Sequence, residues 1–311
     1  MKLFFFFNIL INMLTIGTRG SDLALWQANY IADFIGREKT KITIIKTKGD
    51  KIQNISFEKM EGKGFFTKEI EEALLDKRID IAVHSMKDLP TEDIRGLKIA
   101  AVTKREDPSD VLLIRTECLN KKNFLPLFEW AIVGTSSLRR VAQLKNVMNS
   151  LDIRPIRGNL PTRIKRLREK KFDSIVVARA GLNRLGIDLH EIDDITLPYS
   201  FFLPAPAQGA LALQIREEEV EHFNIVNKLN HRETELAVTA ERAFLKSFGG
   251  GCHIPLGALA YIEKEDVHIT GVIASVDGKH SIRKTVVGNN PEDVGRELAM
   301  LFKKEGADNL I

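Results

Sequence analysis

Short apolar runs, separated by amphipathic segments, fill most of the chain up to about residue 203. The runs have the length of strands buried in a sheet, and they lie at residues 14–17, 41–47, 79–84, 97–103, 111–115, 131–133, 152–156 and 174–178. Between several runs, apolar residues recur at helical spacing, over residues 23–35, 65–74 and 138–147. Strands that alternate with helices in this way predict α/β units.

The last third of the chain follows a different pattern. Residues 204–215 lead from a loop into an apolar strand, which we expect to return to the first α/β unit. A helix from about residue 231 is then followed by consecutive strands and a last helix, predicted near residues 257–263, 266–275, 281–287 and 291–304. Strands that run together predict a separate, small α+β unit.

The predicted fold class is therefore α/β: two α/β domains like those of periplasmic binding proteins, joined by a two-strand hinge, plus a small C-terminal α+β domain. Residues 105–108 are charged and suit the first crossover of that hinge. The predicted boundaries are 14–104 with 207–228 for domain 1, 108–203 for domain 2 and 230–311 for domain 3.

Two segments fall outside this pattern. Residues 1–13 are apolar and rich in phenylalanine, but the run lacks a small-residue cleavage site and is too short to span a bilayer. We interpret it as a lead-in to the first strand, with contact to a membrane as the alternative. Residues 48–64 are polar, which predicts a long mobile loop that can act as a lid, and this loop contains Lys59 and Lys63.

Composition limits the class of protein. The 311 residues exceed one ordinary core, and 44% hydrophobic with 28% charged residues describes a soluble globular chain. The two cysteines, Cys118 and Cys252, lack disulfide or metal-ligand spacing, which suits a reducing compartment. Residues 131–190 hold nine arginines and four lysines against four acids, a net charge of +9 in a chain of +4, so the remainder carries −5. One region is thus suited to anions.

Two glycine-containing turns lead from a strand into a helix. In the first turn Arg19 precedes Ser21, the predicted N-cap, and in the second Ser137 precedes Arg139 and Arg140. Free N–H groups and the helix dipole favour anions at such turns. We therefore expect two anion sites that face a shared cleft. An ordinary loop with a solvated arginine is the alternative for Arg19.

Further arginines lie near the carboxyl ends of predicted strands, the edge at which open α/β sheets bind ligands. They are Arg157, Arg163 and Arg184. Lys87 and Asp88 follow the run at 79–84 in the same way, which suggests a catalytic acid beside a cation. The structural alternative is that Asp88 caps a turn before Pro90 and that Lys87 is its solvated neighbour.

Cys252 follows three glycines and precedes His253. A lone cysteine is usually a buried small hydrophobic residue, but glycines allow the backbone to approach a bulky group and expose the sulfur. Neighbours in an extended chain point apart, so a cysteine–histidine pair of a thiol protease is disfavoured. We interpret the thiol as an attachment point.

Seven segments together resemble the porphobilinogen deaminase family, also called hydroxymethylbilane synthases. They occur in order from about Thr15 to Gly257, and each alone would be weak evidence. They are GTRGS with LALWQA at residues 17–28, GKGFFTKE at 62–69, HSMKDLP at 84–90, VGTSSLRR at 133–140, RGNLPTR at 157–163, AGLNRLG at 180–186 and GGCHIPLG at 250–257.

The resemblance implies a transferase of tetrapyrrole biosynthesis. Such enzymes join four porphobilinogen molecules head to tail into the linear tetrapyrrole hydroxymethylbilane, release ammonia each time, and grow the chain on a covalently bound dipyrromethane cofactor. The thioether would be made to Cys252, and each pyrrole carries two carboxylates, the groups that arginine binds best. The residues implied for cofactor or substrate are Lys87, Arg19, Ser21, Ser137, Arg139, Arg140, Arg157, Arg163 and Arg184, with Lys59 and Lys63 in a loop over the cleft.

Asp88 matches the catalytic acid of that family. Loss of ammonia leaves a cationic pyrrole, and the attacking ring must later lose a proton. A carboxylate beside the ring nitrogens can stabilise the cation and assist both proton movements, whereas lysine cannot.

Two other functions compete with this interpretation. A two-domain binding protein that closes on a polyanion would share the first two domains, but would leave Cys252 without a purpose. A nucleic-acid binder would use the basic region, yet its arginines are spaced singly, without a basic helix face or aromatic platform. We therefore expect porphobilinogen as the partner, no nucleic acid and no membrane, and a cytoplasmic monomer.

Overall fold

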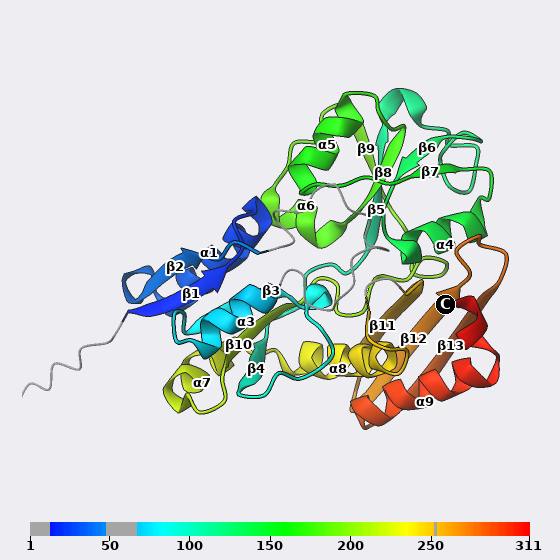
Figure 1. The fold of residues 1–311 in the computed structure, drawn as a ribbon. Coiled ribbons are helices and arrows are strands. Elements are labelled where there is room, and N and C mark those ends of the chain that lie inside the picture. The colour runs from blue at the N-terminus through cyan, green and yellow to red at the C-terminus, as the bar shows by residue number, and fades with distance from the viewer. Residues whose placement is uncertain (1–12, 48–66, 252–253) are drawn as a thin grey trace, which may run out of the picture.

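The computed structural model describes residues 13–47, 67–251 and 254–311. Within these residues the strands form three sheets, two of five strands and one of three (Figure 1). The fold class is that predicted: two α/β units and a small α+β unit at the C-terminus.

The first sheet has the order β2-β1-β3-β10-β4. Its strands are β1 (Leu14–Thr18), β2 (Thr40–Ile44), β3 (Ile81–Ser85), β4 (Leu97–Val102) and β10 (Leu211–Arg216). β1 runs parallel to β2 and β3, and β10 runs antiparallel to β3 and β4. Its helices are α1 (Asp22–Ile35), α3 (Lys68–Leu75) and α7 (Val220–Val226). Successive β3 residues point to opposite faces, so Ile81 and Val83 join the core under α1 while Ala82 joins the core under α3.

The second sheet repeats this arrangement, with the order β7-β6-β8-β5-β9. Its strands are β5 (Asp110–Arg115), β6 (Ile132–Gly134), β7 (Asp152–Arg154), β8 (Ser174–Ala178) and β9 (Ile192–Thr196). β6 runs parallel to β7 and β8, and β5 runs antiparallel to β8 and β9. Its helices are α4 (Leu138–Val147), α5 (Leu160–Arg168) and α6 (Arg179–Leu185). Leu144 of α4 and Leu167 of α5 belong to different cores. Successive residues of β5 join these two cores in alternation.

The third sheet, β11-β12-β13, is antiparallel throughout. Its elements are β11 (Leu256–Glu263), β12 (Asp266–Ala274), β13 (Ser281–Gly288), α8 (Arg232–Lys246) and α9 (Pro291–Lys304). Phe244 of α8 and Phe302 of α9 meet over the sheet with ring centroids 5.0 Å apart. Short 3-10 turns complete the fold: η1 (Arg37–Lys39), η3 (Met86–Asp88), η4 (Thr116–Cys118), η5 (Asn227–Leu229) and η6 (Ala307–Leu310).

Several predicted elements are confirmed, including the helix over 138–147, the strand over 174–178 and the return of the chain to the first sheet through β10. The strand predicted over 41–47 is shorter and ends at Ile44. The apolar pattern does not reveal β9, because Asp193 and Asp194 make it a charged edge strand. Among the described residues, no helix is both long and apolar enough to cross a membrane.

Candidate functional site

Asp88 ends the short turn η3, which directly follows the central strand β3. Met86 and Leu89, which flank Lys87 and Asp88 in sequence, are buried and anchor the turn. The Asp88 side chain is exposed. Its carboxyl group lines a pocket of about 80 Å³ together with Arg19 and Ser21. The structure therefore places two residues of the first glycine turn beside the predicted acid.

Ser21 is the N-cap of α1, as predicted: its Oγ accepts a hydrogen bond from the Ala24 amide at 3.4 Å. Arg19, half-buried in the same turn, lies between β1 and this cap. Ser137 is the N-cap residue of α4, but its side chain makes no capping hydrogen bond; its backbone N–H donates to Thr135 Oγ1 at 3.2 Å.

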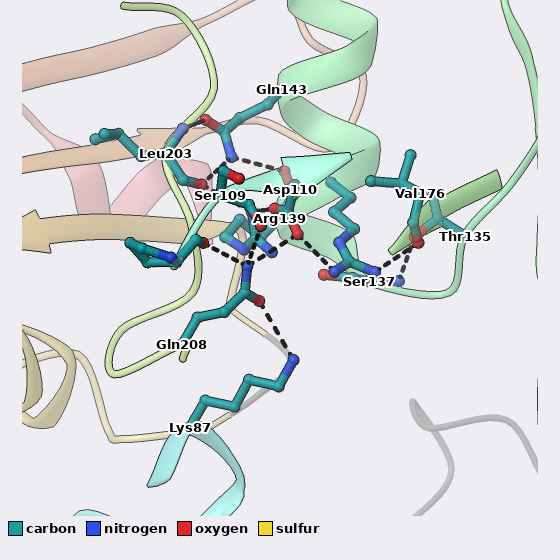
Figure 2. A network of polar contacts seen from close by, with 12 residues as sticks. Lys87, Ser109, Asp110, Thr135, Ser137, Arg139, Gln143, Val176, Leu203 and Gln208 are labelled. Carbon is teal, nitrogen blue, oxygen red and sulfur yellow. Dashed lines mark hydrogen bonds and ion pairs between the residues drawn. The ribbon is translucent and has the colours of Figure 1, made fainter. Parts of the chain in front are cut away.

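Arg139 and Arg140 are buried, with 4% and 6% of their surface exposed, and both pair with Asp110 at the start of β5. Figure 2 shows Arg139 beside Asp110. Arg139 Nη1 lies 2.6 Å from Asp110 Oδ2 and 2.7 Å from the Leu203 carbonyl oxygen. Arg140 Nη2 lies 2.6 Å from Asp110 Oδ1, and its Nη1 donates to the Val176 carbonyl. Burial alone would raise the pKa of Asp110, but the two guanidinium groups hold that pKa well below its usual range.

We call Asp110, Arg139 and Arg140 the Asp110 group. Sequence reasoning missed Asp110, although one signal was available: an acid that opens the wholly apolar run 111–114 requires a cationic partner when that strand is buried. One polar atom of the Asp110 group has unmet hydrogen-bonding capacity. Arg140 Nε is buried without a hydrogen-bond partner in the described part of the chain.

Lys87 extends toward the Asp110 group, and its ammonium donates to Gln208 Oε1 at 3.3 Å (Figure 2). Burial lowers the pKa of Lys87, while the charges of Asp88 and Asp110 oppose that shift. Although Lys87 and Asp88 are neighbours in sequence, their side chains thus lie in different surroundings. Asp88 is exposed toward the pocket, and Lys87 reaches into the polar interior.

Two further predicted arginines, Arg163 and Arg184, belong to α5 and α6 of the second unit. Arg163 Nε donates to the Gly158 carbonyl at 2.8 Å, and burial, together with the charge of Arg140, lowers its pKa to about 10 against the opposing effect of Asp88. Arg163 therefore lies within electrostatic range of both the acid and the Asp110 group.

Arg184 joins the second unit to the first. Its Nη2 donates to the Gly209 carbonyl at 2.6 Å, and its guanidinium lies 5.8 Å from the centroid of the Trp26 ring on α1. Arg157 is half-buried just after β7, at the carboxyl-end edge of the second sheet, as expected.

Cys252, Lys59, Lys63 and the predicted loop 48–64 lie outside the described residues, but the segment just before Cys252 can be placed. Gly250 has φ +71°, and a Cβ there would lie 2.1 Å from Thr91 Oγ1. Gly250 must therefore be glycine for the chain to pass this close to the segment that follows Asp88.

The same segment is held from the third unit. Arg242 of α8 donates to the Leu89 carbonyl at 2.9 Å and to the Pro90 carbonyl at 2.6 Å. The third unit thus contacts the first directly beside the candidate acid.

The charges of the described site do not balance. Among the described residues, the charges that act most strongly on Lys87 and Arg163 are those of Asp88, Asp110, Arg139 and Arg140, so cations outnumber carboxylates there. Arg140 Nε also has no hydrogen-bond partner within residues 13–47, 67–251 and 254–311, so the site fits a ligand that carries several carboxylates, for which guanidinium groups are suited donors.

Comparison with known proteins shows the family of the chain. The family model "Porphobilinogen deaminase, dipyromethane cofactor binding domain" matches residues 14–224, and that for the C-terminal domain of porphobilinogen deaminase matches residues 235–304. This chain belongs to the porphobilinogen deaminase family. The resemblance seen in the seven sequence segments is thereby confirmed.

Curated relatives match almost the whole chain. Porphobilinogen deaminase of Syntrophomonas wolfei is 45% identical over 94% of this chain and 96% of its own length. That of Carboxydothermus hydrogenoformans is 43% identical over 95% of each chain. Among solved structures, the substrate binding protein of an amino acid ABC transporter is similar with a TM-score of 0.38 and 12% identity, covering 76% of this chain and 94% of the other.

Proposed function

We propose that this chain is a hydroxymethylbilane synthase, which joins four porphobilinogen molecules into a linear tetrapyrrole and releases ammonia at each addition. The observation that carries the proposal is the exposed carboxylate of Asp88 beside a group of buried cations, in a chain of the porphobilinogen deaminase family. An acid and several carboxylate-binding groups are what this condensation of acidic pyrroles requires.

Asp88 carries the chemistry in this proposal. Its carboxylate stabilises positive charge that develops on the substrate ring and moves a proton at the ring nitrogen or carbon. Because Asp88 is exposed toward the pocket and Lys87 is turned away into the interior, Asp88 is the better placed of the two to meet the substrate.

The arginines hold carboxylates and orient the pyrrole rings. Arg19, Arg157, Arg163 and Arg184 would bind the substrate, because each lies at least partly accessible near a strand end or turn. Ser21, Ser137, Lys87, Arg139 and Arg140 would hold the dipyrromethane cofactor, which supplies the primer on which the chain grows, and Arg19 and Arg184 would contact the cofactor as well as the substrate. Arg140 Nε, a buried donor without a hydrogen-bond partner among the described residues, would be available to a cofactor carboxylate.

The cofactor would be attached through a thioether to Cys252. The close approach of Gly250 to Thr91 supports this assignment, since it brings the chain two residues before Cys252 next to the segment that carries Lys87 and Asp88. Lys59 and Lys63 would belong to a loop that closes over the cleft.

The remaining assignments complete the proposal. The domains would span 14–104 with 207–228, 108–203, and 230–311, with the crossovers as hinge. The protein would act as a cytoplasmic monomer, without nucleic-acid or membrane partners, and light scattering of the purified protein would test its oligomeric state.

Intact-protein mass tests the central proposal, and the second cysteine offers a matched control. The wild-type protein and Cys118→Ser should exceed their sequence masses by one dipyrromethane, whereas Cys252→Ser should not. The wild type should also convert porphobilinogen to hydroxymethylbilane. A wild-type protein at its bare sequence mass that ignores porphobilinogen would refute the proposal and favour a polyanion-binding protein.

A further inference from the structure

Gln208 lies in the segment through which the chain returns from the second unit to β10, and its backbone is firmly held. Its carbonyl oxygen accepts from Arg105 Nε at 2.8 Å. The preceding residue, Ala207, donates its N–H to Glu241 Oε2 at 2.5 Å, and Glu241 also pairs with Arg105 at 2.7 Å. Because Glu241 belongs to α8, the third unit anchors the main chain at Gln208.

The Gln208 side chain connects the other two units (Figure 2). Its Oε1 accepts from Lys87 Nζ at 3.3 Å, and its Nε2 donates to Asp110 Oδ1 at 3.0 Å and to the Pro108 carbonyl at 2.8 Å. An ammonium offers only donors, and the partners on the other side are only acceptors. The amide therefore fits in one orientation alone, and it is 1% exposed.

This geometry matters for Lys87 because a lysine side chain is long and flexible. Lys87 and Gln208 are 121 positions apart in sequence. Their contact nevertheless connects the Lys87 ammonium to the Asp110 group through the Gln208 side chain. We propose that Gln208 is a positioning residue, which holds the Lys87 ammonium in place next to the Asp88 turn and connects it to the Asp110 group. The inference rests on the proposed function, in which Lys87 lies by the cofactor.

The charged groups that face Lys87 make the contact testable. Asp88 on its own turn and Asp110 on β5 favour the ammonium, whereas burial and the charges of Arg140 and Arg139 on α4 disfavour it. The side-chain oxygen Oε1 of Gln208 adds an acceptor that favours the charged form of Lys87. Removing this acceptor should lower the pKa of Lys87, and replacing it by a carboxylate should raise that pKa.

The test follows the Lys87 side chain itself, by NMR titration of protein with isotope-labelled lysine in a Cys252→Ser background. The Lys87 signal is assigned by its loss in Lys87→Arg. In Gln208→Met, which keeps the volume but removes the acceptor, the titration midpoint should fall by about one pH unit.

Gln143 provides the matched control. It is also a buried glutamine, 2% exposed, but it bonds the Leu203 backbone and does not contact Lys87. Gln143→Met should therefore leave the Lys87 midpoint where it is in the parent protein.

Gln208→Glu is a second variant, in which the Lys87 titration midpoint should shift upward. It tests the inference if Gln208→Met does not fold. An unchanged midpoint in the Gln208 variants would overturn the inference, and so would equal shifts in the Gln208 and Gln143 variants, which would indicate a general structural effect. Because the wild-type enzyme is assayed separately for bilane formation, failure of the proposed function would be seen independently.

Discussion

Acidification should destabilise the first α/β unit through His84, which lies on β3 four residues before Asp88. His84 is 4% exposed, and its Nε2 lies 3.1 Å from Gln214 Oε1 on the neighbouring strand β10. Burial lowers the pKa of His84 from 6.5 to about 4, although the bond to Gln214 partly opposes the shift. The folded unit therefore holds a neutral imidazole that the unfolded chain would protonate more readily.

The sign follows from the depressed pKa. Near pH 7 His84 is neutral in the folded and in the unfolded chain, so its protonation does not change the free energy of unfolding. As the pH falls from 6.5 to about 4, the unfolded chain takes up a proton that the folded chain does not, and folding stability is lost. At one pKa unit per 1.36 kcal/mol, the loss amounts to about 3 kcal/mol at pH 4.

Urea unfolding at pH 7, 5.5 and 4 measures this loss. The chain has two tryptophans, so a Trp130→Phe background leaves Trp26 on α1 as the fluorescent reporter of the first unit. His84→Gln serves as comparison, because it keeps a polar group near Gln214 without the titration.

Other titrating groups cancel in this comparison. Glu71, whose pKa is raised by burial, gains a proton in both proteins and shifts stability in the opposite direction. The difference in unfolding free energy between the two proteins should thus change by about 3 kcal/mol between pH 7 and pH 4. A constant difference across this range would refute the reasoning.

Other perturbations follow from the same contacts. Asp88→Ala should lower the rate of bilane formation by at least about 100-fold with an unchanged circular dichroism spectrum, and near-normal rates would refute its role. Asp110→Asn should cost about 3–5 kcal/mol of unfolding free energy in urea, because it leaves two buried guanidinium groups without a counter-charge; a loss below about 1 kcal/mol would contradict this account. Glu241→Gln should lower the thermal unfolding midpoint strongly, since the largely buried Arg105 then loses its counter-charge, and an unchanged midpoint would count against the anchoring of the return segment.

Much of the fold could be predicted because its units have strong local patterns. The core strands β3 and β8 are almost wholly buried and follow apolar runs, and α4 has apolar residues at helical spacing, so the pattern locates them. The pattern fails for β9, an edge strand that contains Asp193 and Asp194, and for α6, which spans only seven residues.

The candidate site was predicted in its residue types and only partly in its arrangement. Lys87 and Asp88 follow β3 as expected, and Ser21 caps α1. Arg139 and Arg140 were expected to face anions at a helix start, and the structure adds that they are buried against Asp110. The proposed roles of these residues remain predictions that the experiments above would test.

By itself, the sequence determined the α/β class, most strands and helices, and membership of the porphobilinogen deaminase family, because those properties depend on local periodicity and on short motifs. Only the tertiary structure decided that Asp110 pairs with two arginines and that Gln208 joins Lys87 to this group. These partners are 29 to 121 residues apart. Such pairings arise when packed sheets exclude water and each buried charge must find a partner, and no local pattern in the chain specifies which partner it is.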